Sequence, residues 1–346
     1  MNAVLERLVC EHNASDEQLL TLLTSADADT LQALHRAARA VCDERYGKVV
    51  LIRGLIEFTN HCCNNCLYCG IRRDHASAKR YRLTPEEVLA CCATGYALGF
   101  RTFVLQGGED GYFTDERLCA LVCAIKQAHP DCAVTLSVGE RSKESYRRLR
   151  EAGADRYLLR HETIDAEHYA RLHASEQSHE RRMLCLRELR ELGYQVGCGF
   201  MVGSPYQTMD MLVRELRFIQ AFRPQMVGIG PFLPHHATPF AAFSAGSVER
   251  TLTLLSLIRL LLPDVLLPAT TALGTVSADG RERGILAGAN VVMPNLSPPE
   301  VRKQYTLYDH KRCTGDEAAE HLQRLNAGLQ RIGYQISVER GDSRVH

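Results

Sequence analysis

Hydrophobic and polar positions follow two different patterns along the chain. Within residues 1–48, apolar residues recur at helical spacing. Ser15 and Gln18 have the spacing of a capping box just before a leucine-rich run, and Gly47 stands where a second helix is expected to end. From Val49 onward, short apolar runs alternate with longer amphipathic segments. The pattern therefore predicts a helical N-terminal extension followed by alternating strands and helices.

The alternating part of the chain contains eight runs that are typical of buried strands. These runs are Val49–Thr59, Thr102–Gly107, Ala133–Val138, Arg156–Glu162, Gln195–Val202, Met226–Phe232, Leu266–Leu273 and Ala289–Met293. Regular alternation of strands with helices predicts right-handed βαβ units and a parallel sheet. Eight strands in roughly 245 residues fit a closed (β/α)8 TIM barrel better than an open doubly wound sheet. We therefore expect an α/β protein with a helical N-terminal extension at 1–48, a complete barrel at 49–300 and a C-terminal helical tail at 301–346 that closes the barrel.

Composition and charge limit the classes of function. The chain has 346 residues with 41 Lys+Arg and 41 Asp+Glu, so its formal net charge is +0. This balance argues against bulk attraction to nucleic acid or to a membrane surface. The N-terminus lacks the features of a secretory signal, and the most apolar stretch, Leu252–Leu262, contains Arg259 and is too short to span a bilayer. We expect a cytoplasmic protein without membrane or nucleic-acid partners, whose 14 cysteines are thiols or metal ligands rather than disulfides.

Four of those cysteines lie within eight residues, directly after the first predicted strand: Cys62, Cys63, Cys66 and Cys69. Active sites of barrels are built on such loops. Zinc is one interpretation, but a structural zinc site usually takes two separated ligand pairs, and no second pair follows at a suitable spacing. The spacing Cys62-x₃-Cys66-x₂-Cys69 suits three irons of a cubane 4Fe–4S cluster and leaves the fourth iron open to a small molecule. A frame that starts at Cys63 is also possible from the spacing.

The cysteine spacing, with aromatic Tyr68 before the last cysteine, resembles the signature of radical S-adenosylmethionine (SAM) enzymes. The resemblance selects Cys62, Cys66 and Cys69 as cluster ligands and makes Cys63 a bystander. It implies that SAM chelates the open iron and that an electron from the cluster cleaves SAM to a 5′-deoxyadenosyl radical. Nine cysteines elsewhere are expected to pack as small hydrophobes: Cys10, Cys42, Cys91, Cys92, Cys119, Cys123, Cys132, Cys185 and Cys198.

Residues at the predicted strand ends are candidate SAM ligands. The second strand ends in Gly107-Gly108-Glu109, where glycines let the backbone approach a ligand closely. The resemblance implies that this turn binds the amino group of SAM. Strand alternation places Arg160 and Glu162 on one face, and charges inside a barrel are costly unless they are paired or hold a ligand. Glu162 suits the ribose hydroxyls or the ammonium of SAM, and Arg160 suits an anionic group.

Two further SAM contacts come from the resemblance alone. Arg182 is expected to pair with the carboxylate of SAM. The segment Gly199–Thr208 resembles the family element that packs against adenine, which makes Met201 an adenine contact or a core residue. Tyr68 is counted with these cofactor-binding residues.

Further blocks narrow the resemblance to the HydE family of FeFe-hydrogenase maturases, which help build the two-iron subcluster of the hydrogenase. These blocks are Ile56–Asn60, Asn65–Gly70, Val104–Asp110, Gly153–Thr163, Met226–Phe232, Pro268–Ala272 and Gly288–Pro294. The resemblance implies a substrate that is an iron–cysteine complex with carbon monoxide and cyanide, attacked by the radical at sulfur. It implies HydG, the GTPase scaffold HydF and an electron donor as partners.

The same resemblance implies a set of polar ligands inside the cavity. Hydroxyls and a guanidinium there would suit a carboxylate or cyanide, although threonines also favour strands for their β-propensity alone. Ser137 is expected on the SAM side, and Arg160 is expected to act in catalysis as well as binding. The expected substrate ligands are Thr135, Arg160, Thr270, Thr271, Tyr305 and Tyr308.

One departure from the family concerns a second iron–sulfur cluster, which some members hold with three cysteines near the C-terminal end. Here Cys313 stands without a later cysteine. Because one thiolate cannot hold a cluster, we expect a single 4Fe–4S cluster.

Two other functions remain open from the sequence. A methylornithine-synthase-like or biotin-synthase-like radical enzyme would use the same barrel, although Arg160-His161-Glu162-Thr163 favours the maturase. A scaffold without catalytic activity, holding iron–sulfur or zinc, is a hypothesis of another class, which reductive cleavage of SAM would exclude.

Overall fold

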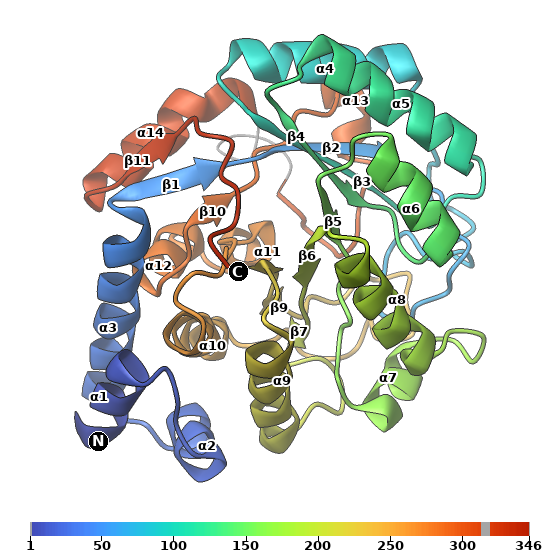
Figure 1. The fold of residues 1–346 in the computed structure, drawn as a ribbon. Helices are drawn as coiled ribbons and strands as arrows, with labels where there is room; N and C mark the ends of the chain where they lie inside the picture. The colour runs from blue at the N-terminus through green and yellow to red at the C-terminus, as the bar shows by residue number, and fades with distance from the viewer. Residues whose placement is uncertain (1, 313–318, 346) are drawn as a thin grey trace.

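A parallel sheet of six strands forms the centre of the protein in this computed structural model, which describes residues 2–312 and 319–345 (Figure 1). The strand order is β2-β3-β4-β5-β6-β8, so successive strands are neighbours in space. They are β2 (Gly54–Thr59), β3 (Thr102–Gly107), β4 (Ala133–Ser137), β5 (Arg156–Leu158), β6 (Gln195–Cys198) and β8 (Met226–Val227). Helices lie around the outside of the strands (Figure 1), which confirms the predicted α/β class.

Many of the helices begin at a Ser, Thr or Asp whose side chain accepts a hydrogen bond from the first turn. Thr84 and Glu87 form a capping box at the start of α4, with Pro85 in the first turn. The helices are α1 (Asn2–Cys10), α2 (Asp16–Thr24), α3 (Ala28–Tyr46), α4 (Pro85–Ala97), α5 (Asp115–Ala128), α6 (Lys143–Glu151), α7 (Ala166–Leu172), α8 (His179–Glu191), α9 (Met209–Phe222), α10 (Val248–Leu261), α11 (Thr271–Val276), α12 (Gly280–Leu286), α13 (Pro299–Arg302) and α14 (Leu322–Arg331), with a 3₁₀ turn at Ala319–His321.

The first predicted strand is two strands. β1 (Val49–Ile52) pairs with β10 (Val291–Val292) and with β11 (Gln335–Ser337), whereas β2 begins the six-stranded sheet. The buried Arg53 separates β1 from β2. The sequence analysis missed β11, a short strand at the end of the chain. A further short pair joins β7 (Met201–Val202) and β9 (Gly230–Pro231).

The seventh predicted strand, Leu266–Leu273, is mostly wrong. Single bridges remain at Leu266, which pairs with Met226, and at Pro268, which pairs with Val291. From Thr271 onward the chain is helix α11. Proline has no backbone N–H, so Pro268 cannot donate to a strand ladder. With the bridge from Asn295 to Leu55, these contacts connect β8 through β10 to β2.

The two helices predicted in the N-terminal extension form as α2 and α3, and a further helix, α1, precedes them. α2 has the complete Ser15–Gln18 capping box, and α3 ends at Gly47, whose φ of 72° favours glycine. α3 packs against α10, where the His35 ring hydrogen bonds to Ser256 Oγ at 2.8 Å. The division of the chain at residues 48 and 300 stays a prediction.

The last described residues lie against the N-terminal ends of the central strands, near the middle of the ring of elements (Figure 1). The Arg156 guanidinium of β5 donates to Asp342 at 2.7 Å, and Gln195 of β6 donates to the same carboxylate at 2.9 Å. Thr102 of β3 donates to the carbonyl of Arg340 at 2.7 Å. The chain end therefore covers the end of the sheet opposite to the carboxyl ends of the strands.

Among the helices of the described residues, none is both long enough and apolar enough to cross a membrane.

The burial of α10 predicts a large effect of a core substitution. Leu257 is fully buried, whereas Leu184 on α8 is 39% exposed. We expect Leu257→Ala to lower the free energy of unfolding by about 2–5 kcal/mol because it leaves a cavity, and Leu184→Ala to change it by less than about 1 kcal/mol. Urea denaturation of the metal-free protein measures both values, and equal losses would contradict this placement of α10.

Candidate active site

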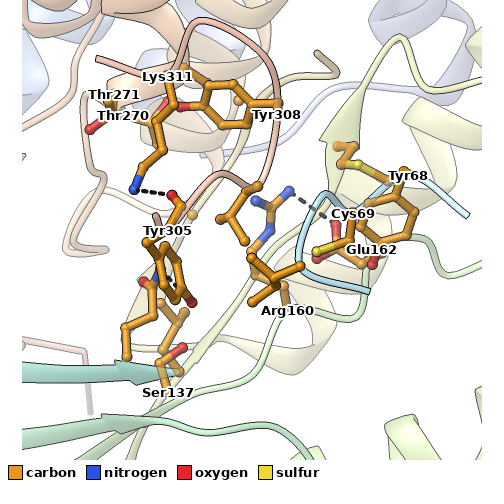
Figure 2. A pocket seen from close by; sticks show the side chains of 18 of the residues that line it. Tyr68, Cys69, Ser137, Arg160, Glu162, Thr270, Thr271, Tyr305, Tyr308 and Lys311 are labelled. Carbon is orange, nitrogen blue, oxygen red and sulfur yellow. Dashed lines mark hydrogen bonds and ion pairs between the residues drawn. The ribbon is translucent and has the colours of Figure 1, made fainter. Parts of the chain in front are cut away.

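A cavity of about 350 Å³ opens at the carboxyl ends of the central strands. Its wall includes Cys62, Cys66 and Cys69. Figure 2 shows Cys69 on one side of the cavity and Tyr305 of the C-terminal segment on another. Ligand sites of parallel α/β folds lie at this end of the strands. The structure therefore brings the cysteine loop (residues 60–70) and most of the predicted substrate ligands to one cavity.

The three predicted cluster cysteines share one environment that differs from that of Cys63. All three line the cavity, whereas Cys63 is exposed and does not. Burial raises the pKa of the Cys62 thiol to about 12, and burial together with the neighbouring Cys66 and Cys62 raises the pKa of Cys69. Without a metal these thiols hold their protons, so cluster binding must release protons.

The cysteine loop sits directly on the end of β3. A Cβ on Gly108 would lie 2.3 Å from the carbonyl oxygen of His61 and 2.7 Å from the Cβ of Cys62. The amide of Cys63 donates to the carbonyl of Glu109 at 2.8 Å. Glycine is therefore required at position 108 for the strand end and the cysteine loop to meet.

The Glu109 side chain occupies the space beside Gly139 where a Cβ would otherwise lie. A Cβ on Gly139 would lie 1.9 Å from Glu109 Cγ, and the amide of Glu140 donates to Glu109 Oε1 at 3.0 Å. Burial raises the pKa of Glu109, partly offset by Arg182. A cationic group of a ligand would stabilise the ionised form of this carboxylate.

Arg182 is held between several acceptors. Its side chain pairs with Glu140, donates to the carbonyl of Arg160 at 2.7 Å and lies 3.9 Å from Glu109 Oε1. This arrangement makes Arg182 a residue that positions Glu109 and the Arg160 backbone, in addition to any contact with a ligand carboxylate.

Arg160 and Glu162 face each other across the cavity wall, with 3.0 Å between Nη2 and Oε2 (Figure 2). Neither atom has hydrogen-bond geometry with a described partner, and both are buried. Glu162 has a φ of 65°, which is uncommon for a residue other than glycine and typical of functional sites. The buried His161, between these two residues, donates to Glu215 of α9 at 2.7 Å and thereby fixes the backbone of residues 160–162.

The remaining predicted SAM contacts also line the cavity. Ser137 and Met201 belong to its wall. Tyr68 is partly buried beside His173, with 3.2 Å between the hydroxyl oxygen and Nε2. Burial lowers the pKa of His173 to about 3, so its ring is neutral. Because His173 Nδ1 lies 2.9 Å from the carbonyl of Tyr169 and must donate to it, Nε2 accepts the proton of Tyr68.

The polar groups of this wall fit SAM. Glu109 and Glu162 offer carboxylates for an ammonium and for hydroxyls, and Met201 offers an apolar surface for a base. Glu162 Oε2 is buried and ion-paired with Arg160 but accepts no hydrogen bond, so it can still accept one from a ligand hydroxyl. The three thiols fit an iron–sulfur cluster with one open iron.

Four of the predicted substrate ligands, Thr270, Thr271, Tyr305 and Tyr308, line the cavity together with Arg160 (Figure 2). Thr135 does not. It lies one inward-facing position deeper on β4 than Ser137 and lines a separate cavity of about 10 Å³ with Arg53 and Arg156. The prediction that Thr135 shares the substrate cavity is therefore wrong in this structure, because the side chains of the barrel interior separate the two spaces.

Sequence reasoning missed an ion pair in the cavity wall. The Lys311 ammonium pairs with Glu57 and donates to the carbonyl of Tyr305 at 3.0 Å (Figure 2). The side chains of Lys311 and Glu57 are 8% and 0% exposed. A carboxylate in the middle of the otherwise apolar strand β2 was the signal for a buried cationic partner.

Most of the cysteines predicted to pack do so. Six are buried and two are partly buried, whereas Cys10 is exposed. Cys313 lies outside the described residues.

The thiol triad beside a polar cavity, at the carboxyl ends of parallel strands, defines a class of enzyme. A family model described as the Radical SAM superfamily matches residues 56–219, from β2 into α9. The chain is also 46% identical to the FeFe hydrogenase maturase subunit HydE of Thermotoga maritima, over 86% of this chain and 84% of that protein. The protein is thus a radical SAM enzyme, and it belongs to the HydE family of hydrogenase maturases.

Two other relatives support the fold. The chain is 31% identical to the 3-methylornithine synthase of Methanosarcina barkeri, over 88% of this chain and 86% of that protein. The crystal structure of methylornithine synthase (PylB) superposes with a TM-score of 0.86 at 29% identity, covering 96% of this chain and 97% of that one. The radical SAM α/β fold predicted from the sequence is therefore confirmed.

The close contact at Gly108 predicts a specific loss. We expect Gly108→Ala to reduce the iron and sulfide bound after anaerobic reconstitution severalfold, because the added methyl group displaces the cysteine loop. Gly111→Ala is the matched control, since its Cβ would meet nothing within 4 Å. Full cluster loading of Gly108→Ala would contradict the contact.

Proposed function

We propose that this protein acts in assembly of the FeFe-hydrogenase active site and that its substrate is an iron–cysteine complex bearing carbon monoxide and cyanide. The single observation that supports this proposal is the shared cavity, which joins three thiols to a polar wall with two cations, Arg160 and Lys311. The relative named as a hydrogenase maturase provides the biological setting. The isolated bridges that connect β8 to β2 support a complete (β/α)8 barrel with its helical extension and tail around this cavity.

On the cofactor side, Cys62, Cys66 and Cys69 would hold one 4Fe–4S cluster. Gly107, Gly108 and Glu109 would bind the amino end of SAM, and Ser137, Glu162, Arg182, Met201 and Tyr68 would bind the rest of the molecule. When bound, the cluster and SAM supply a 5′-deoxyadenosyl radical. The protein contributes exclusion of water and a fixed position for the reacting sulfur.

On the substrate side, the cavity wall suits an anionic group. Arg160 offers a guanidinium, and Thr270 offers a buried Oγ1 without a described hydrogen-bond partner. Lys311 is already paired with Glu57 and donates to the Tyr305 carbonyl, so it brings little net charge and keeps one of its three N–H donors for a ligand. Thr271, Tyr305 and Tyr308 complete a pocket for a carboxylate or cyanide ligand. Arg160 lies between the cofactor side and the substrate side of the cavity and would orient the substrate towards SAM.

The partners follow from the proposed pathway. HydG, HydF and a one-electron donor would work with this protein, and we propose a single cluster per chain in the cytoplasm.

A second candidate function is a methylornithine-synthase-like rearrangement of an amino acid. The observations that favour it are the 31% identity to 3-methylornithine synthase and the close superposition on PylB. A carboxylate pocket around Arg160 would serve that substrate as well.

Cysteine variants test the cluster assignment. We expect Cys62→Ala, Cys66→Ala and Cys69→Ala each to abolish the cluster, since each removes one of three thiolates, whereas Cys63→Ala should leave it. Iron and sulfide analysis of the reconstituted proteins measures this. A stoichiometry of two cubanes per wild-type chain would contradict the single cluster.

Activation of apo-hydrogenase tests the function. We expect activation with HydG and HydF to require this protein, and Thr270→Val to lower activation roughly tenfold because the valine cannot donate to the substrate. Thr135→Val is the matched control, because Thr135 Oγ1 is also buried without a described partner but lines the other cavity.

Two results would contradict the proposal. Formation of 3-methylornithine without activation of hydrogenase would favour the second candidate. A reduced protein that forms no 5′-deoxyadenosine, even with the iron–cysteine complex present, would favour a scaffold.

A further inference from the structure

One of the three cluster cysteines has a side-chain amide beside its sulfur. Gln177 lies in the loop between α7 and α8, with its Nε2 3.4 Å and its Oε1 3.5 Å from Cys66 Sγ. By contrast, the hydrogen bonds that lower the pKa of the Cys62 and Cys69 thiols come from the backbone, at Asn64, Glu109 and Ile71. Cys66 is therefore distinguished from the other two ligands by a residue about 110 positions away in the sequence.

The position of Gln177 is determined by contacts between its loop and the cysteine loop. The backbone N–H of Gln177 donates to the carbonyl of Ala174 at 3.0 Å, which closes a turn. The neighbouring Glu176 pairs with Arg73 at 3.2 Å, beyond the last cysteine. The Leu67 amide, beside Cys66, donates to the carbonyl of Leu172 at 2.9 Å. These three contacts keep the side-chain amide of Gln177 beside the sulfur of Cys66.

The chemistry of a bound thiolate selects the orientation of the amide. A thiolate has no proton to donate, so it repels the Oε1 oxygen and accepts from Nε2–H. Tyr68 also lies near Cys66, but its hydroxyl proton goes to His173, whose Nδ1 must donate to the Tyr169 carbonyl. Gln177 is therefore the side chain best placed to donate to this sulfur.

We propose that Gln177 is a positioning residue that donates an N–H···S hydrogen bond to the cluster thiolate of Cys66 and raises the reduction potential of the cluster. Hydrogen bonds to cysteine sulfur withdraw negative charge, and the reduced cluster, which has one more electron, gains more from them than the oxidised one. The electron comes from a low-potential one-electron donor. The proposal rests on the cluster ligands proposed above.

The test is a redox titration of the reconstituted wild-type protein and of Gln177→Leu, followed by EPR of the reduced cluster with dithionite as reductant. We expect a lower midpoint potential in Gln177→Leu, seen as a roughly threefold to tenfold smaller ratio of reduced to oxidised cluster at a fixed solution potential. Gln177→Glu, which replaces the donor by a carboxylate, should lower the midpoint further. Ser175→Ala, an exposed change in the same loop, should leave it unchanged.

The outcomes separate this proposal from the cluster assignment. A wild-type protein that assembles no cluster at these cysteines would overturn the proposed function. An unchanged midpoint in Gln177→Leu, with a full cluster, would overturn only the role of Gln177. If the variants bind no cluster, pulsed EPR of reduced wild-type protein labelled with ¹⁵N in its glutamine side chains decides: a hyperfine coupling to that nitrogen supports the hydrogen bond, and its absence overturns it.

Discussion

The contact between the end of β3 and the cysteine loop is the constraint on which the rest of the site depends. Gly108 has no side chain, so its backbone lies against His61 and Cys62. That approach allows the Cys63 amide to bond to the Glu109 carbonyl and places the Glu109 carboxylate beside the thiols. In the proposed function SAM would contact both the cluster and the Glu109 carboxylate, and a side chain at position 108 would move the cysteine loop away from β3.

The buried charged side chains near this contact are paired with one another. Arg182 pairs with Glu140 and approaches Glu109, while it also holds the carbonyl of Arg160. Because buried charges need partners, this arrangement fixes the cofactor wall before any ligand binds. Two buried oxygen atoms of the cavity wall, Glu162 Oε2 and Thr270 Oγ1, form no hydrogen bond with a described residue and are therefore available to a ligand.

Residues of the C-terminal segment contact both ends of the central sheet. At the carboxyl ends of the strands, the carbonyl of Leu307 accepts from Gly70 in the cysteine loop, and Lys311 pairs with Glu57 on β2. At the other end, Asp342 binds Arg156 of β5. A residue far along the chain therefore forms part of the cavity wall, and the end of the chain covers the opposite side of the sheet.

The cysteine spacing, the Gly107-Gly108-Glu109 turn and the strand–helix alternation could be interpreted from the sequence because they are local patterns with a fixed periodicity or spacing. The sequence by itself thus determined the α/β class and the Ser15–Gln18 capping box. It also limited the cluster ligands to four neighbouring cysteines, among which the family resemblance selected Cys62, Cys66 and Cys69.

Only the tertiary structure decided the contacts between distant segments. It separated β1 from β2, replaced most of the strand predicted over Leu266–Leu273 with helix, and moved Thr135 to another cavity. It also brought Lys311 to Glu57 and Gln177 to Cys66. The physical reason is that the packing of the whole chain, and not any local pattern, determines which buried charge or sulfur meets which distant donor.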